Sequence, residues 1–470
     1  MTSDIPLTIK EAAEALRTGE TTSVAITEAV LARVERLNDE LGAYVTVTKD
    51  QALEQAARAD VDLAAGKDTG PLQGIPLAVK DIIAMRGAGT TANSRILDGG
   101  WCPDHEAPVA ARLRAAGSVF VGKTTTSEFA LGLPDPDKGF LVPHNPWNVA
   151  HTPAGSSSGT GIAVAAGLAL GGLGTDTGGS VRGPAAANGH TGLKVTFGRV
   201  PKSGVVPLGY SLDSIGPMAR SAYDCALMLE VMAGFDPSDP NAADVPVPVY
   251  STQLDGDVDA LKIALPMPYF FDHEMLDPEV RDAVLAAVGR LGEMGAAVAE
   301  TSLPYAAEAK EANHIILVAE AFAYHRNNLV SRWTDYGAFT RPSLARGAFF
   351  SSADVMQANR LRTAFSAEVA SLFREHDVIV TPAAVTPAER ADTMDVSKRL
   401  SQPSYTGHWN LTGLPAVAIP VGLSADGLPM SMQIIGKPFA EATVLKVADA
   451  LQRVTDWHLL VPPIAQPAAV

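Results

Sequence analysis

Short apolar segments that are cut by glycine and proline constrain this chain more than any other feature. From Pro71 onward, helical stretches such as 109–116 and 440–453 alternate with these segments. Alternation of this kind predicts an α/β protein whose sheet is mostly buried. The expected strands are IPLAV (75–79), SVFV (118–121), LALGGLG (168–174), VIVT (378–381), AVAIP (416–420) and SMQII (431–435).

Two helical patterns precede the first of these strands. Thr8 and Glu11 have the spacing of a capping box, and apolar residues recur at helical spacing after Ser23. The segment 236–375 is also helical in pattern, and no repeat or linker divides the chain. We therefore predict a single domain over 1–470, with a helical N-terminal arm (1–70), a core (71–235), a variable helical insertion (236–375) and a C-terminal part of the same sheet (376–470).

Charge and cysteine content limit the partners and the compartment. The chain has 36 basic and 52 acidic residues, a net charge of −16, which disfavours binding to nucleic acid. Only Cys102 and Cys225 are present, as expected in a reducing compartment. The N-terminus lacks the pattern of a signal peptide, and the most apolar run, 162–173, is shorter than the ~20 residues that cross a bilayer. We expect a cytoplasmic protein without a membrane or nucleic-acid partner.

Three motif matches lack the context that their usual functions require. Residues 117–124 match a phosphate loop, but a helical stretch precedes them, which favours a helix end followed by a core strand. Residues 155–159 match a nucleophile elbow around Ser157, but no strand leads into them. Cys102 and His105 lack a second pair of ligands, so no metal site is expected.

Two loops that are rich in glycine and serine, together with one lysine, are the candidates for chemistry. The loops AGSSSG (154–159) and GTDTGGS (174–180) lie before and after a helix of small residues and a strand. After this one helix and one strand, the chain can return to the first loop, so the two loops can lie together. Lys80 ends a buried strand, where burial lowers the pKa of an amine, and a neutral lysine can act as a general base. Plain turns and a lysine that extends into solvent are the structural alternatives.

Taken together and in order, these motifs resemble the amidase signature family. The resemblance covers most of the chain from about Pro71, and 235–375 is poorly matched. It implies a central mixed β-sheet that is covered by helices on both faces. The matching segments are GIPLAVKD (74–81), NPW (145–147), AGSSSG (154–159), GTDTGGSVRGPAA (174–186), GLKVTFGRV (192–200), GVVPLGYSLDSIGPMAR (204–220), NLTGLPA (410–416) and GLPMSMQIIG (427–436).

The resemblance implies a Ser–Ser–Lys triad. Ser180 matches the nucleophile of the family, Lys80 matches its base, and Ser156 matches the bridging serine, which in this family follows a cis peptide bond. The implied oxyanion hole consists of backbone N–H groups in the nucleophile loop, from Thr177, Gly178, Gly179 and Ser180. Phe129 matches a position near the acyl pocket, although a core aromatic residue fits that position nearly as well.

The implied activity is hydrolysis of a carboxamide, or of an ester or carbamate, to an acid and an amine through a seryl acyl-enzyme. It needs no metal and no organic cofactor. The expected partner is a small-molecule amide substrate, and a homodimer is one option for assembly. Four aromatic residues point to an aryl or bulky acyl group, with core packing as the alternative: Tyr324, Phe349, Phe350 and Trp409.

The alternative function is that of the A subunit of a glutamyl/aspartyl-tRNA amidotransferase, which releases ammonia from glutamine. That subunit typically reads GKTNxDEF where this chain has GKTTTSEF (122–129). It also typically has a glutamine-binding Asp seven residues before the Asn that matches Asn410, and here that position is Pro403. We therefore prefer stand-alone hydrolysis. A binding protein without activity is a third option, which the intact triad positions disfavour.

Overall fold

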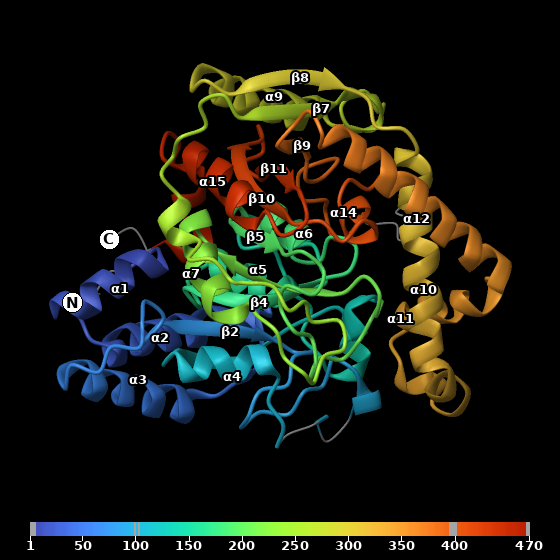
Figure 1. Cartoon of the computed structure of the whole chain (residues 1–470). Coiled ribbons are helices and arrows are strands. Elements are labelled where there is room, and N and C mark those ends of the chain that lie inside the picture. Colours follow the sequence, from blue (N-terminus) through green and yellow to red (C-terminus); the bar gives the residue numbers. More distant parts are fainter. Residues whose placement is uncertain (1–5, 98–99, 102–103, 394–401, 467–470) are drawn as a thin grey trace.

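All parts of the chain contribute to one large mixed sheet. The computed structural model describes residues 6–97, 100–101, 104–393 and 402–466, so Cys102 lies outside the described residues. Within these ranges, eleven strands form the sheet and helices cover both of its faces (Figure 1), which confirms the predicted α/β class. The largest core cluster of the described residues extends from the first helix to the last, and smaller clusters lie beside it.

The sheet has the strand order β1-β3-β2-β4-β6-β5-β10-β11-β9-β7-β8. Strand β2 is parallel to both of its neighbours, as is β7, and the remaining pairs are antiparallel. The strands are β1 (Tyr44–Val47), β2 (Pro76–Lys80), β3 (Val119–Thr124), β4 (Gly171–Asp176), β5 (Thr191–Lys194), β6 (Ser214–Ala219), β7 (Lys262–Pro266), β8 (Ala297–Thr301), β9 (Val378–Pro382), β10 (Ala416–Leu423) and β11 (Pro429–Gly436).

The helices pack around this sheet in three groups. In the N-terminal group, α2 and α3 pack near β3 and α1 packs against α7. Helices α5–α7 and α15 cover the middle of the sheet, and α10–α12 line one side of the molecule (Figure 1). The helices are α1 (Ile9–Thr18), α2 (Ser23–Leu41), α3 (Lys49–Ala64), α4 (Pro108–Ala115), α5 (Ser158–Ala165), α6 (Arg182–Asn188), α7 (Ala222–Met232), α8 (Met267–Phe270), α9 (Pro278–Glu293), α10 (Ala306–Ser331), α11 (Thr340–Ala345), α12 (Ser352–Leu372), α14 (Gly407–Leu411) and α15 (Glu441–Gln452).

Most of the local predictions agree with this structure. All six expected strands are present, as β2, β3, β4, β9, β10 and β11. Thr8 and Glu11 form the predicted capping box at the start of α1. Gly117 has φ +80° between α4 and β3, so the phosphate-loop match is a helix end followed by a strand. Lys123 of that motif is buried, and its Nζ lies 3.1 Å from Asp81 Oδ1.

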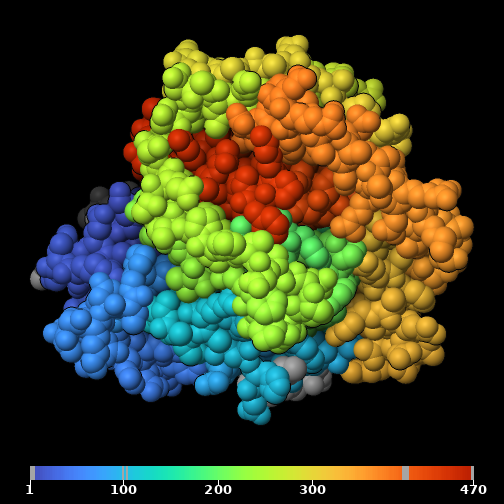
Figure 2. All heavy atoms as spheres, viewed as in Figure 1, coloured from blue at the N-terminus to red at the C-terminus, as the bar shows by residue number. Residues whose placement is uncertain are grey.

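The prediction of a helical insertion over 236–375 needs a correction. This segment contains the long helices α10 and α12, but it also contributes β7 and β8, which extend the sheet at one edge. β8 is exposed along nearly all of its length, so the alternation of apolar and polar residues that reveals a half-buried strand is missing there. Figure 2 shows the C-terminal residues, in red, between this edge and the segment near 200–250, in yellow-green.

Candidate active site

Lys80 lies at the end of β2, where its side chain is fully buried. Its Nζ is 2.7 Å from Ser156 Oγ and 2.7 Å from Thr175 Oγ1. Burial lowers the pKa of Lys80 to about 7, and the negative charges of Asp176 and Asp213 partly oppose this effect. A large fraction of the amine is therefore neutral at physiological pH, and a neutral Nζ can accept a proton from a hydroxyl group.

Ser156 lies in the first serine loop, two residues before α5 begins at Ser158. The peptide bond between Gly155 and Ser156 is cis, as the resemblance implied. The carbonyl oxygen of Ser156 accepts a hydrogen bond of 2.9 Å from Thr126 Oγ1, which holds the residue in place. The backbone N–H of Ser157 donates to the carbonyl oxygen of Ser180 (3.2 Å), so the two serine loops lie side by side.

Ser157 has a structural role in this arrangement. Its side chain is fully buried, and its Oγ donates to Thr175 O (3.3 Å) and accepts from Thr175 N (3.2 Å). The hydroxyl group therefore connects the start of α5 to β4. An elbow nucleophile needs an exposed Oγ, so the structure disfavours Ser157 in that role.

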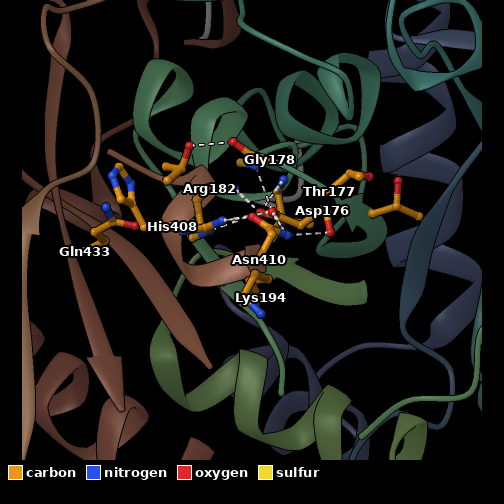
Figure 3. Close-up of polar contacts among 12 residues, drawn as sticks. Asp176, Thr177, Gly178, Arg182, Lys194, His408, Asn410 and Gln433 are labelled. Carbon is orange, nitrogen blue, oxygen red and sulfur yellow. Dashed lines mark hydrogen bonds and ion pairs between the residues drawn. The ribbon is translucent and has the colours of Figure 1, made fainter. Parts of the chain in front are cut away.

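The second serine loop (174–180) is organised around the buried ion pair of Asp176 and Arg182 (Figure 3). Arg182 Nη2 is 2.9 Å from Asp176 Oδ1, and both side chains are fully buried. Arg182 also donates to Gln433 Oε1 (2.9 Å) and Asn410 Oδ1 (2.7 Å). Burial alone would raise the pKa of Asp176, but the charge and hydrogen bonds of Arg182 hold it well below its usual range. Asp176 is thus a fixed anion around which the loop folds.

Side chains from distant elements hold the carbonyl oxygens of this loop. Asn410 Nδ2 donates to Asp176 O (2.9 Å), Asn313 Nδ2 donates to Thr177 O (3.5 Å), and Thr406 Oγ1 donates to Gly178 O (2.6 Å). In a planar trans peptide, the N–H group points away from the carbonyl oxygen. The amides that follow these three carbonyls therefore face away from the anchoring side chains.

The backbone amides of the loop differ in what they can bind. Gly179 N–H donates to Asp176 Oδ1 (2.8 Å), so the predicted oxyanion role of Gly179 needs a correction. Within the described part of the chain, no residue accepts a hydrogen bond from the amides of Thr177, Gly178 and Ser180. These three N–H groups remain as candidate donors to an oxyanion.

Two cavities meet at Ser180, which is half-buried. The larger cavity, of about 400 Å³, reaches both Ser156 and Ser180. The smaller cavity, of about 250 Å³, extends from Ser180 past Gly183 towards Glu389. Ser180 is therefore accessible to a small molecule from two directions. The residues that line both cavities are Thr152, Ala154, Gly155, Gly178 and Ser180.

Phe129 lies beside the larger cavity without lining it. Its ring is buried against His325 and Tyr336, with centroid distances of 4.3 Å and 5.8 Å. Ser127 and Ala130 on either side do line the cavity. Phe129 thus supports this wall, and a direct contact with substrate stays a prediction.

The expectation of an aromatic acyl pocket is wrong for the four aromatic residues on which it rested. Trp409 is fully buried, whereas Tyr324 and Phe349 are 45% and 85% exposed. Neither these residues nor Phe350 line the two cavities at Ser180.

Sequence reasoning missed two residues, one that contacts Lys80 and one that contacts the loop 174–180. Lys80 Nζ contacts Thr175 as well as Ser156. The position of Thr175 directly before Asp176 in the GTDTGGS motif could have indicated this contact. Asn313 lies in the middle of α10, and no sequence signal marks it. Its role depends on how α10 packs against the loop.

The described ranges contain neither a metal centre nor a membrane span. No group of His, Cys, Asp or Glu side chains there is arranged to hold a metal ion. No helix in the described part of the chain is long and apolar enough to span a membrane.

A buried lysine bonded to a cis-peptide serine, next to an accessible serine in a glycine-rich loop, defines an α/β enzyme class distinct from hydrolases with a nucleophile elbow. Comparisons with known proteins place the chain within this class. The model of the Amidase family matches residues 25–445. The chain therefore belongs to the amidase signature family and is an enzyme of the amide-hydrolysing type.

Individual relatives are similar over nearly the whole chain. The A subunit of the glutamyl-tRNA(Gln) amidotransferase from Roseiflexus sp. (strain RS-1) is 41% identical over 97% of this chain and 98% of its own length. The structure of the native peptide amidase from Stenotrophomonas maltophilia has a TM-score of 0.85 and 28% identity, over 97% and 98% of the two chains. The A subunit of the corresponding amidotransferase from Thermotoga maritima has a TM-score of 0.81 and 29% identity, over 96% of each chain.

Proposed function

We propose that this enzyme hydrolyses a carboxamide through an acyl-enzyme on Ser180. The observation that carries the proposal is the contact of 2.7 Å between buried Lys80 Nζ and Ser156 Oγ, beside the loop that exposes Ser180 to two cavities. Lys80 is the base, Ser156 the bridging residue and Ser180 the nucleophile. No metal or organic cofactor takes part in this scheme.

In this scheme protons move along one relay. Neutral Lys80 takes the proton of Ser156, Ser156 takes the proton of Ser180, and Ser180 Oγ attacks the amide carbon. Ser156 then gives a proton to the nitrogen of the leaving amine, the C–N bond breaks, and an ester remains on Ser180. Water hydrolyses this ester by the same relay in the reverse direction.

The oxyanion in this reaction is bound by amides of the nucleophile loop. The amides of Thr177, Gly178 and Ser180 are the proposed donors, since Gly179 N–H is bonded to Asp176. Donors that are fixed before the reaction cost no reorganisation when charge develops, and the loss of one reduces transition-state stabilisation by about 3–4 kcal/mol. The side chains that hold the loop carbonyls provide this fixation.

A second candidate is the glutaminase activity of an amidotransferase A subunit. The curated relatives favour it over stand-alone hydrolysis, because the Roseiflexus protein is 41% identical over 97% of this chain. Pro403 in place of the expected Asp, and Ser127 in the GKTTTSEF segment, speak against glutamine as the substrate. A site that is built around a polar contact tolerates its loss badly.

The test pairs two serine substitutions. Ser180→Ala abolishes the acyl-enzyme that mass spectrometry detects with an active amide, whereas Ser157→Ala retains it at a reduced level. If Ser157→Ala lost the acyl-enzyme and Ser180→Ala kept it, the result would support the nucleophile-elbow mechanism instead. The substrates are aliphatic amides, aryl amides, anilides, carbamates and glutamine. Ammonia release from glutamine that requires added amidotransferase partner proteins would establish the second candidate.

Three broader expectations stay predictions. The cysteine content and the sequence pattern predict a cytoplasmic location. The net charge of −16 disfavours nucleic acid as a partner. A homodimer is one option for assembly, which a sedimentation experiment on the purified chain decides.

A further inference from the structure

The two cavities at Ser180 have very few charged groups in their walls. No Asp, Glu, Lys, Arg or His is among the described residues that line the larger cavity. In the smaller cavity, the one charged side chain in the described lining is Glu389, which is acidic. Among the described residues around a substrate in these cavities, no cationic side chain is therefore present to bind a carboxylate.

Two cations that lie close to this site, Lys80 and Arg182, already have partners. Lys80 Nζ is bonded to Ser156 and Thr175, and burial favours its neutral form. Arg182 is fully buried and is bonded to Asp176, Asn410 and Gln433. Neither side chain lines the two cavities. A carboxylate in either cavity would have to lose its water without gaining an ion pair, which is strongly unfavourable.

The walls of the larger cavity favour an uncharged acyl group. Leu131, Leu133, Leu208 and Leu317 provide apolar surface, and the polar groups between them are hydroxyl groups and backbone. The Oγ of Ser158, a residue that also lines this cavity, is buried with no hydrogen-bond partner in the described structure. Such a wall binds hydrocarbon by excluding water and bonds neutral polar groups through hydroxyls.

We infer that the substrate is a neutral amide whose acyl part carries no carboxylate, and that free glutamine is a poor substrate. This inference rests on the proposed acyl-enzyme mechanism. Glutamine carries an α-carboxylate and an α-ammonium group near the scissile amide. Among the described wall residues, the one charged side chain is Glu389, which is negative. It can pair with the ammonium group but not with the carboxylate.

The test compares amides of matched length that differ in charge. Pentanamide and methyl 4-carbamoylbutanoate are neutral, 4-carbamoylbutanoate carries a carboxylate, and glutamine is a zwitterion. We expect kcat/KM for both neutral amides, measured by ammonia release, to exceed that for 4-carbamoylbutanoate and for glutamine at least 100-fold. Equal or greater kcat/KM for either charged amide would overturn the inference.

A substitution in the wall tests the cause of this preference. Leu131 is half-buried, so Leu131→Arg can place a cation at the edge of the larger cavity, and Leu131→Met is the size control. Leu131→Arg is expected to increase kcat/KM for 4-carbamoylbutanoate relative to pentanamide at least tenfold, whereas Leu131→Met leaves the ratio within twofold. An unchanged ratio in Leu131→Arg contradicts the inference.

The failure of the mechanism and the failure of this inference have different signatures. If no amide in the series acylates Ser180, the proposed mechanism fails, and this inference fails with it. If the acyl-enzyme forms on Ser180 and forms as readily from glutamine as from pentanamide, the mechanism stands and the inference alone is overturned.

Discussion

At the residue scale, burial of single charged side chains determines what the site can do. Lys80 and Arg182 are both fully buried, but their surroundings differ. Lys80 has hydroxyl groups rather than a carboxylate as its hydrogen-bond partners, and burial lowers its pKa to about 7. Arg182 forms an ion pair with the carboxylate of Asp176. One buried cation is thus suited to proton transfer and the other to holding a loop.

Activity should depend on pH through Lys80. The base works only when it is neutral, and burial lowers the pKa of Lys80 to about 7. We expect kcat/KM to rise about tenfold per pH unit below pH 7 and to level off above it. The measurement is a pH–rate profile with a neutral amide. A profile that stays flat to pH 5 would contradict a lysine base.

Removal of Arg182 should destabilise the protein strongly. Arg182→Ala leaves the carboxylate of Asp176 buried without its cation, which costs about 3–5 kcal/mol of the free energy of unfolding. Denaturant unfolding measures the loss. The matched control is Arg390→Ala, which removes an exposed ion pair with Asp392 and should change stability little. Similar losses in the two variants would show that burial of the pair is unimportant.

Sequence alone predicted candidate residues that stand in local motifs and missed those that act through packing. Lys80, Ser156 and Ser180 stand in recognisable motifs, and the structure brings Lys80 to Ser156 and the two serine loops together. The commitment of Gly179 N–H to Asp176 depends on how the loop curls. The contact of Asn313 depends on the docking of α10. Neither follows from spacing in the sequence.

At the element scale, buried strands with apolar runs were predictable, whereas exposed edge strands and the short buried strands β5 and β6 were not. β2, β9 and β10 are buried along almost their whole length and consist mostly of apolar residues. β1 and β8 lie at the two edges of the sheet and are mostly exposed. An edge strand forms because the neighbouring strand has free backbone N–H and C=O groups. The sequence of the edge strand itself does not indicate that such a neighbour is present.

Close packing of α5 against its surroundings should make Gly159 sensitive to substitution. A Cβ atom there would lie 2.2 Å from Ala43 O and 2.5 Å from Thr125 N, both backbone atoms. We expect Gly159→Ala to lower the free energy of unfolding by about 1–3 kcal/mol. The control is Gly289→Ala in α9, where nothing lies within 4 Å, and it should gain about 0.5–1 kcal/mol. Equal effects of the two substitutions would refute the packing argument.

At the scale of the whole molecule, one continuous sheet joins strands from the N-terminal and C-terminal parts of the chain. β5 pairs with β10, and β9 lies between β11 and β7. β1–β6 form one half of the strand order and β7–β11 the other, and the pair β5–β10 joins the two halves. The bonds of Arg182 to Asn410 and Gln433, and a core cluster that spans both halves, hold them together.

The unfolding of the chain should accordingly be cooperative. Cys225 is fully buried, and burial raises the pKa of its thiol, so the thiol reacts only when the core opens. In a Cys102→Ser background, tryptophan fluorescence, far-UV circular dichroism and alkylation of Cys225 should give coincident urea transitions. Two separated transitions would contradict the single-domain prediction.

The anchoring of the nucleophile loop has a consequence for the chain during its synthesis. Arg182 is bonded to Asn410 and Gln433, which follow it by 228 and 251 residues. At a translation rate of about 5–20 residues per second, the ribosome needs about 10–50 s to reach Gln433 after it has added Arg182. During this time the nascent chain already contains Lys80, Ser156 and Ser180, but the partners that fix the loop do not yet exist. We therefore expect the nascent chain to have no activity on the ribosome until its synthesis is almost complete.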